Sequence, residues 1–162
     1  MGPNNTTTGL VEGAKAPEFQ LPGDGGRSIS LRDYSGGNLV IYFYPKDDTK
    51  GCTKESIEFT QAKKAFAATN TKIIGISADS VASHDKFKAK HELDLTLVSD
   101  EEKTAIEDYG VWVEKNMYGR KYMGIERATF LVDSHGKIAK IWRKVRVPGH
   151  VDSVLKAAQE LA

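Results

Sequence analysis

The single cysteine of this chain, Cys52, has the position of a reactive group. It follows an apolar run, residues 38–44, that is typical of a buried strand, and it begins a stretch with helical spacing. The unpaired N–H groups and the dipole at a helix N-terminus favour the thiolate, which is the nucleophilic form of cysteine. Thr49 stands three residues earlier and offers a hydroxyl to the sulfur or to a substrate oxygen. This spacing resembles a C-x-x-C pair without its first cysteine, so it indicates single-thiolate chemistry.

The alternative interpretation of Cys52 is a buried and inert side chain. Free cysteines are among the residues most often found in protein interiors. The polar run before Cys52, residues 46–50, argues against a place in the core. Position and polarity alone leave both interpretations open.

Other kinds of site find little support in the sequence. One cysteine cannot form a disulfide within the chain, and the four histidines, at positions 84, 91, 135 and 150, lack the close spacings of metal ligands. His84 and His91 lie on one face of a predicted helix, which we expect to be solvated. The glycine-rich phosphate loops and the serine-hydrolase elbow are also absent. We therefore expect neither a cofactor nor a metal.

Composition describes an ordinary globular chain of about one domain. Of the 162 residues 40% are hydrophobic and 28% are charged, and 23 Lys and Arg nearly balance 22 Asp and Glu. This balance gives no argument for binding nucleic acid, and no apolar run approaches the length of a membrane span. Residues 1–9 are polar and unlike a secretory signal, so we expect a flexible lead, a single domain over residues 10–162 and a cytoplasmic protein.

The hydrophobic pattern predicts alternating strands and helices after a small hairpin around the glycine turn at residues 23–26. The predicted strands are residues 38–44, 71–77, 96–99, 127–132 and 137–145, and the predicted helices are residues 52–69, 83–91, 101–109 and 150–161. A β-α-β half followed by a β-β-α half predicts a thioredoxin-like α/β fold, in which a central mixed sheet has helices on both faces and the hairpin is an addition at the edge.

The segment of residues 111–124 is the least regular in pattern, and we predict irregular structure for it. It contributes three aromatic residues, Trp112, Tyr118 and Tyr122, to a group that Tyr109 begins. Aromatic side chains are packing units first, so we expect these four to be buried rather than to form a collar for a ligand.

The segment around Cys52 resembles a known family. Pro45, Thr49 and Cys52 match the P-x-x-x-[TS]-x-x-C motif of the peroxiredoxins, and residues 42–47 with Gly51-Cys52-Thr53 are similar to the peroxiredoxin Q, or bacterioferritin comigratory protein, branch. The resemblance continues in family order through residues 114–119, 124–131, 142–145 and 149–150. It covers residues 10–162.

This resemblance implies a peroxidase that reduces hydrogen peroxide or alkyl hydroperoxides. Cys52 would attack the O–O bond and become a sulfenic acid, with Thr49 as a hydrogen-bond partner of thiolate and peroxide and Pro45 as a shield of the pocket. Arg127 would polarise the peroxide and stabilise the thiolate; without the resemblance it is a surface arginine at the start of a strand. Glu55 would orient Arg127 or simply complement the helix dipole.

The sequence departs from the branch at the resolving cysteine. The two positions where members carry it are Ile57 and Lys88 here, and Lys50 replaces a usual proline. We therefore expect a one-cysteine mechanism in which an external thiol, such as thioredoxin, glutaredoxin or glutathione, reduces the sulfenic acid.

Two other functions remain to be weighed against a peroxidase. A non-catalytic redox sensor or holdase would not need Thr49, Cys52 and Arg127 together. An S-transferase or thiol hydrolase would need a general base near Cys52, and no histidine lies nearby in the sequence. We expect a monomer, because no apolar face is left unassigned to the core.

Overall fold

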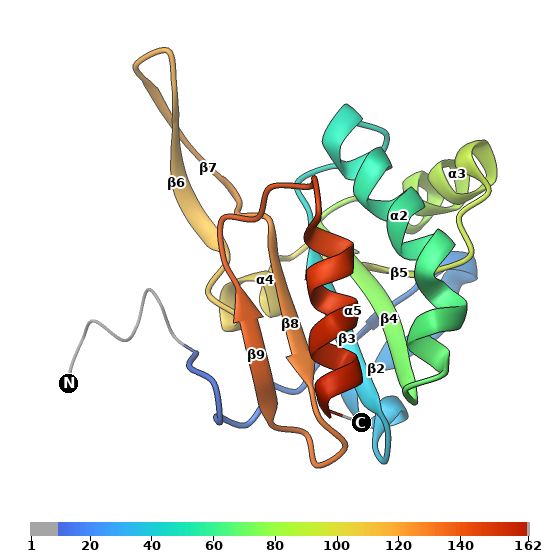
Figure 1. The fold of residues 1–162 in the computed structure, drawn as a ribbon. Helices are drawn as coiled ribbons and strands as arrows, with labels where there is room; N and C mark the ends of the chain where they lie inside the picture. The colour runs from blue at the N-terminus through green and yellow to red at the C-terminus, as the bar shows by residue number, and fades with distance from the viewer. Residues whose placement is uncertain (1–9, 162) are drawn as a thin grey trace.

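The computed structural model describes residues 10–161, so the expected flexible lead lies outside the described residues. Its centre is a five-stranded sheet in the order β5-β4-β3-β8-β9 (Figure 1). The strands are β3 (Asn38–Phe43), β4 (Thr71–Ser77), β5 (Thr96–Ser99), β8 (Ala128–Val132) and β9 (Ile138–Trp142). β3 pairs in parallel with β4 and antiparallel with β8, which makes the sheet mixed. The predicted thioredoxin-like arrangement is confirmed.

The apolar run of β3 is buried on both faces, as its pattern predicts. Val40 and Tyr42 belong to one hydrophobic cluster, and Leu39, Ile41 and Phe43 belong to the other. This alternation follows from the two-residue period of a strand. β3 is therefore the central element of both cores.

Helices cover both faces of the sheet (Figure 1). α2 (Lys50–Ala67) and α5 (His150–Leu161) bury apolar side chains in the cluster that contains Tyr42, and α3 (Val81–His91) adds Phe87 to the same cluster. The short α4 (Thr104–Asp108) packs in the opposite cluster. Within residues 10–161 no helix is long and apolar enough to cross a membrane.

The predicted N-terminal hairpin is present and is fastened to the main body. Its elements are β1 (Gln20–Pro22), η1 (Asp24–Gly26), β2 (Ser28–Ser30) and the following η2 (Leu31–Tyr34). The Asp24 carboxylate accepts hydrogen bonds from the Leu97 backbone N–H and from Lys88 Nζ, both at 2.8 Å. Lys88, at one of the positions expected for a resolving cysteine, thus ties α3 to this turn.

The prediction of irregular structure for residues 111–124 is wrong. β6 (Trp112–Met117) and β7 (Arg120–Ile125) form an antiparallel hairpin that projects from the body (Figure 1). Tyr118 and Gly119 both have positive φ, 54° and 80°, as a two-residue hairpin turn requires. The pattern hid these strands because most of their side chains face solvent on both sides, which removes the usual alternation.

The hairpin also corrects the expectation for the aromatic residues. Tyr109 is fully buried and Trp112 is partly buried, as predicted. Tyr118 is completely exposed and Tyr122 is 42% exposed, so the packing interpretation is wrong for these two.

One glycine of β4 decides how closely α2 can approach the sheet. Gly75 lies opposite Tyr42, and a Cβ at position 75 would lie 2.6 Å from the Tyr42 ring. The Tyr42 hydroxyl is hydrogen-bonded to Ser56 Oγ of α2 at 2.9 Å. The Tyr42 ring stacks on the Phe59 ring, with 4.6 Å between the ring centroids. The space left by Gly75 therefore lets Tyr42 hold α2.

We predict that Gly75→Ala lowers the free energy of unfolding by about 1–3 kcal/mol, because an added methyl group in a packed core forces its neighbours to move. Chemical denaturation measures this change. The exposed Lys72→Ala on the same strand is the control and should stay within about 0.5 kcal/mol of the wild type. A similarly small effect of Gly75→Ala would contradict the close approach.

Candidate active site

Cys52 is the third residue of α2, immediately after the loop that leaves β3. Its side chain is buried, with 1% of the residue exposed, and it joins the cluster that α2 and α5 cover. The expectation that the polar run at residues 46–50 keeps Cys52 out of the core is therefore wrong. The physical reason is that the first turn of α2 directs the sulfur toward a partly buried guanidinium.

That guanidinium belongs to Arg127, which lies 75 positions further along the chain. Its Nη2 donates a hydrogen bond to Cys52 Sγ at 3.4 Å. The residue directly precedes β8, and its backbone carbonyl accepts a hydrogen bond from Val145 N at 2.9 Å. Only 17% of the Arg127 side chain is exposed, so a permanent positive charge with little solvent screening lies beside the sulfur.

Glu55 holds the other branch of the same guanidinium. Arg127 Nη1 donates to Glu55 Oε1 at 2.6 Å, and the Glu55 side chain is completely buried. Burial raises the pKa of Glu55 to about 7, although the charge and the hydrogen bond of Arg127 act in the opposite direction. Its Oε2 has no hydrogen-bond partner among the residues the structure describes. The hydrogen bond joins Glu55 to one branch of the guanidinium, and its expected role of orienting Arg127 remains a prediction.

Gly51 allows the guanidinium to reach the helix. A Cβ at this position would lie 3.1 Å from Arg127 Nη2, a shorter distance than most Cβ atoms keep from their neighbours. Because Nη2 is the group that contacts Cys52, a larger residue at position 51 would displace the arginine from the sulfur.

Thr49 and Pro45 lie in the loop that precedes Cys52. The Thr49 backbone carbonyl accepts a hydrogen bond from Thr53 N at 2.8 Å as α2 begins. The Thr49 hydroxyl donates to the Lys46 carbonyl at 2.8 Å in this structure. Pro45 is partly buried at the start of the same loop. A hydrogen bond from Thr49 to the sulfur or a peroxide, and the shielding by Pro45, remain predictions.

Two further residues near the guanidinium received no role from the sequence. Burial and repulsion by Arg127 lower the pKa of Lys115, which comes from β6. Burial, with a smaller contribution from Arg127, lowers the pKa of His150 to about 4, so its imidazole is neutral near pH 7. His150 Nε2 lies 2.7 Å from Thr129 Oγ1. Both residues lie in segments that resemble the family, and this resemblance was the one signal in the sequence that could have indicated a role for them.

The expectation of a solvated histidine face on α3 is wrong for His84, which is completely buried. His84 Nδ1 lies 2.7 Å from Asp47 Oδ2, and Nε2 lies 2.9 Å from the Val98 carbonyl. Burial opposes a charge on His84, but the hydrogen bond and the negative charge of Asp47 outweigh it and raise its pKa. The partner lies 37 positions away, so the helical pattern could not reveal it.

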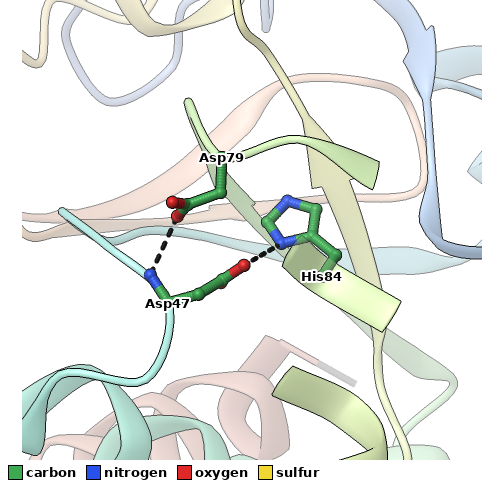
Figure 2. A group of neighbouring side chains, drawn as sticks. All are labelled: Asp47, Asp79 and His84. Carbon is green, nitrogen blue, oxygen red and sulfur yellow. Dashed lines mark hydrogen bonds and ion pairs between the residues drawn. The ribbon is translucent and has the colours of Figure 1, made fainter. Parts of the chain in front are cut away.

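Asp47, Asp79 and His84 form a compact group, and within residues 10–161 it is the one place where side chains of metal-ligating type cluster (Figure 2). Hydrogen bonds already occupy it. Both nitrogens of His84 have partners, the Tyr44 hydroxyl donates to Asp47, and the Ser77 hydroxyl donates to Asp79. A cation would have to displace these hydrogen-bond donors, so the three side chains do not fit a metal site.

Comparison with known proteins finds relatives over most of the chain. The profile of the AhpC/TSA family matches residues 13–141. Peroxiredoxin Bcp of Bacillus subtilis is 45% identical over 150 residues, which cover 93% of this chain and 96% of that protein. A structure of Xanthomonas campestris peroxiredoxin Q matches with a TM-score of 0.84 and 42% identity, covering 98% and 94% of the two chains. A structure of a Xylella fastidiosa PrxQ mutant matches with a TM-score of 0.89 and 37% identity, covering 93% and 96%.

The chain therefore belongs to the AhpC/TSA family of thioredoxin-fold peroxiredoxins. Within that family it falls in the peroxiredoxin Q, or Bcp, branch, and it is a thiol peroxidase. Its single cysteine fits a one-cysteine mechanism.

We predict that Glu55 makes the stability of the wild type depend on pH. Because its pKa is raised on folding, its contribution to stability is fully present below about pH 4.5 and is lost as the pH rises through about 7. Glu55→Gln keeps an oxygen acceptor for Arg127 but cannot titrate. Between about pH 4.5 and about pH 8, the variant should therefore gain about 3 kcal/mol relative to the wild type.

Denaturant unfolding at a series of pH values measures that difference. Glu160→Gln removes one negative charge at an exposed position of α5, away from Glu55, and is the matched control. A difference between Glu55→Gln and wild type that stays constant across the pH range would show that Glu55 is not a desolvated carboxyl group.

Proposed function

We propose that Cys52 is the peroxidatic nucleophile of this peroxidase and that Arg127 is its main electrostatic partner. The observation that supports the proposal is the 3.4 Å contact between Arg127 Nη2 and Cys52 Sγ. Glu55 and Gly51 support it because one orients the guanidinium and the other leaves room for it.

In the proposed reaction the Cys52 thiolate attacks the hydrogen-bearing oxygen of hydrogen peroxide or of an organic hydroperoxide. The S–O bond forms as the O–O bond breaks, so the sulfur is oxidised to sulfenic acid and the peroxide is reduced. The leaving oxygen carries away the electron pair and takes a proton from solvent, which gives water or an alcohol. A fixed guanidinium stabilises the charge that moves from sulfur to oxygen. Thr49 would donate to the peroxide after its hydroxyl rotates away from Lys46, and Pro45 would limit access of water.

The proposed reductant is an external thiol, such as thioredoxin, glutaredoxin or glutathione. Ile57 is partly buried on α2, and Lys88 is engaged with Asp24, so neither of the positions expected for a resolving cysteine supplies a thiol. A reducing compartment would provide such a thiol, and we therefore place the reaction in the cytoplasm. We propose a monomer as the working form, although the exposed Met117, Tyr118 and Met123 of the hairpin weaken the expectation that every apolar face is covered.

A non-catalytic sensor or holdase is not favoured. Such a module would have no use for a partly buried arginine that is hydrogen-bonded to one carboxyl group and to one sulfur.

We predict that the fate of oxidised Cys52 depends on an added thiol. One equivalent of peroxide should produce the sulfenic acid, and excess peroxide without a thiol should add two oxygens and inactivate the protein. Glutathione should divert the sulfenic acid to a mixed disulfide, and dithiothreitol should sustain turnover. Intact-mass measurement and peroxide consumption report these outcomes.

Cys52→Ser is the control for this experiment. It should keep the fold and consume no peroxide, because a serine hydroxyl does not ionise near neutral pH. A quantitative covalent dimer of the wild type at low peroxide would instead mean that a second copy supplies the resolving thiol.

A further inference from the structure

The loop between β3 and α2, residues 44–49, sets the position of the first turn of α2 and therefore of Cys52. Its conformation is not one that the chain adopts freely. Asp48 has a φ of 60°, in the left-handed region of backbone conformation that residues other than glycine rarely occupy. Such a backbone persists only when surrounding contacts hold it.

The strongest of these contacts comes from α3 and meets the preceding residue, Asp47. His84 Nδ1 lies 2.7 Å from Asp47 Oδ2, and the Ser83 hydroxyl donates to the same oxygen at 2.8 Å. The Tyr44 hydroxyl donates to the other oxygen, Oδ1, at 2.6 Å. The side chains of Asp47 and His84 are 3% and 0% exposed, so water cannot replace one partner if the other is lost.

The same histidine is fixed from its other side by the central sheet. Its Nε2 lies 2.9 Å from the Val98 carbonyl of β5, which can only accept, so Nε2 carries a hydrogen. The Asp47 backbone N–H donates to Asp79 Oδ2 at 2.8 Å, which anchors the loop a second time (Figure 2). His84 therefore connects a rigid strand to the loop through one planar ring.

A second group of contacts between α3 and the loop is exposed to solvent. Lys90 Nζ and His91 Nε2 lie 2.7 Å and 2.8 Å from the two carboxylate oxygens of Asp48. Ion pairs in water contribute little, whereas breaking a buried pair leaves an uncompensated polar group. The buried contact is therefore the one that decides the geometry of the loop.

We propose that Asp47 and His84 are positioning residues for the peroxidase reaction: the pair fixes the β3–α2 loop and thereby places the Cys52 sulfur against Arg127. Neither residue touches the sulfur in this structure, so the pair acts through the loop. The inference rests on the proposed role of Cys52.

Two substitutions of His84 separate its two hydrogen bonds. The amide nitrogen of asparagine lies near the place of Nδ1, so His84→Asn keeps a donor to Asp47 and loses the Val98 contact. The amide nitrogen of glutamine lies near the place of Nε2, so His84→Gln keeps the Val98 contact and loses Asp47. Lys88 lies four residues after His84 on α3 and forms an ion pair with Asp24. Lys88→Met removes this ion pair and is the control for effects that come only from a weaker attachment of α3.

Three measurements are made on each purified full-length variant: the second-order rate of sulfenic acid formation, the rate of Cys52 alkylation by iodoacetamide, and thermal unfolding. We expect His84→Gln to react with peroxide about 10-fold to about 100-fold more slowly, because small displacements of a reacting group cost that much. His84→Asn should recover most of the rate, and Asp47→Asn combined with His84→Gln should cost little more than His84→Gln alone. Lys88→Met should keep the wild-type rate whatever its thermal stability.

The inference is overturned if folded His84→Gln reacts as fast as the wild type, or if all the variants slow in proportion to their loss of stability. Alkylation reports the placement of the thiol even if the wild type does not reduce peroxide. An altered alkylation rate in His84→Gln with no peroxide reaction in the wild type would therefore reject the proposed role of Cys52 while supporting the positioning pair. Equal alkylation rates in both proteins would reject the positioning pair.

Discussion

The pairing of the partly buried Arg127 guanidinium is the interaction on which the site depends. One branch contacts Cys52 Sγ at 3.4 Å and the other contacts Glu55 Oε1 at 2.6 Å. A cation with little exposure to water is costly unless it is paired, and here a cysteine sulfur and a carboxyl group of the same helix share it. Burial raises the pKa of Glu55 to about 7, although the charge and the hydrogen bond of Arg127 act in the opposite direction. Stabilisation of negative charge on the sulfur is the role we propose for the other branch of the guanidinium.

Each part of the fold that surrounds the site keeps this contact short. Arg127 directly precedes β8, and Cys52 lies in the first turn of α2. Gly51 has no side chain that would keep the guanidinium away from the sulfur. Tyr42 and the space at Gly75 hold α2 against the sheet. α3 is hydrogen-bonded to the loop that precedes α2. The reactive geometry is thus a property of the sheet and of two helices packed on it, and the cysteine alone does not create it.

The sequence was most informative where one local pattern determined the structure. The strand at residues 71–77 and the helix at residues 150–161 have the predicted bounds, because a strand buried on both faces gives a continuous apolar run and a helix buried on one face gives a helical period. The hairpin at residues 112–125 was missed because its strands are mostly exposed. Arg127 and His84 meet partners 75 and 37 positions away, and no local pattern encodes such distances. Only the family resemblance placed Arg127 in the site, and nothing in the sequence indicated that His84 is buried.

The most direct test of the account is Arg127→Met, which replaces the cation by an uncharged side chain that still fills much of the space. The measurement is the second-order rate of sulfenic acid formation at Cys52 with hydrogen peroxide. The exposed Arg120→Met of the hairpin is the matched control. Loss of Arg127 should slow the reaction about 100-fold, the usual effect of removing one fixed donor from a developing charge. A rate within about twofold of the control would contradict the account.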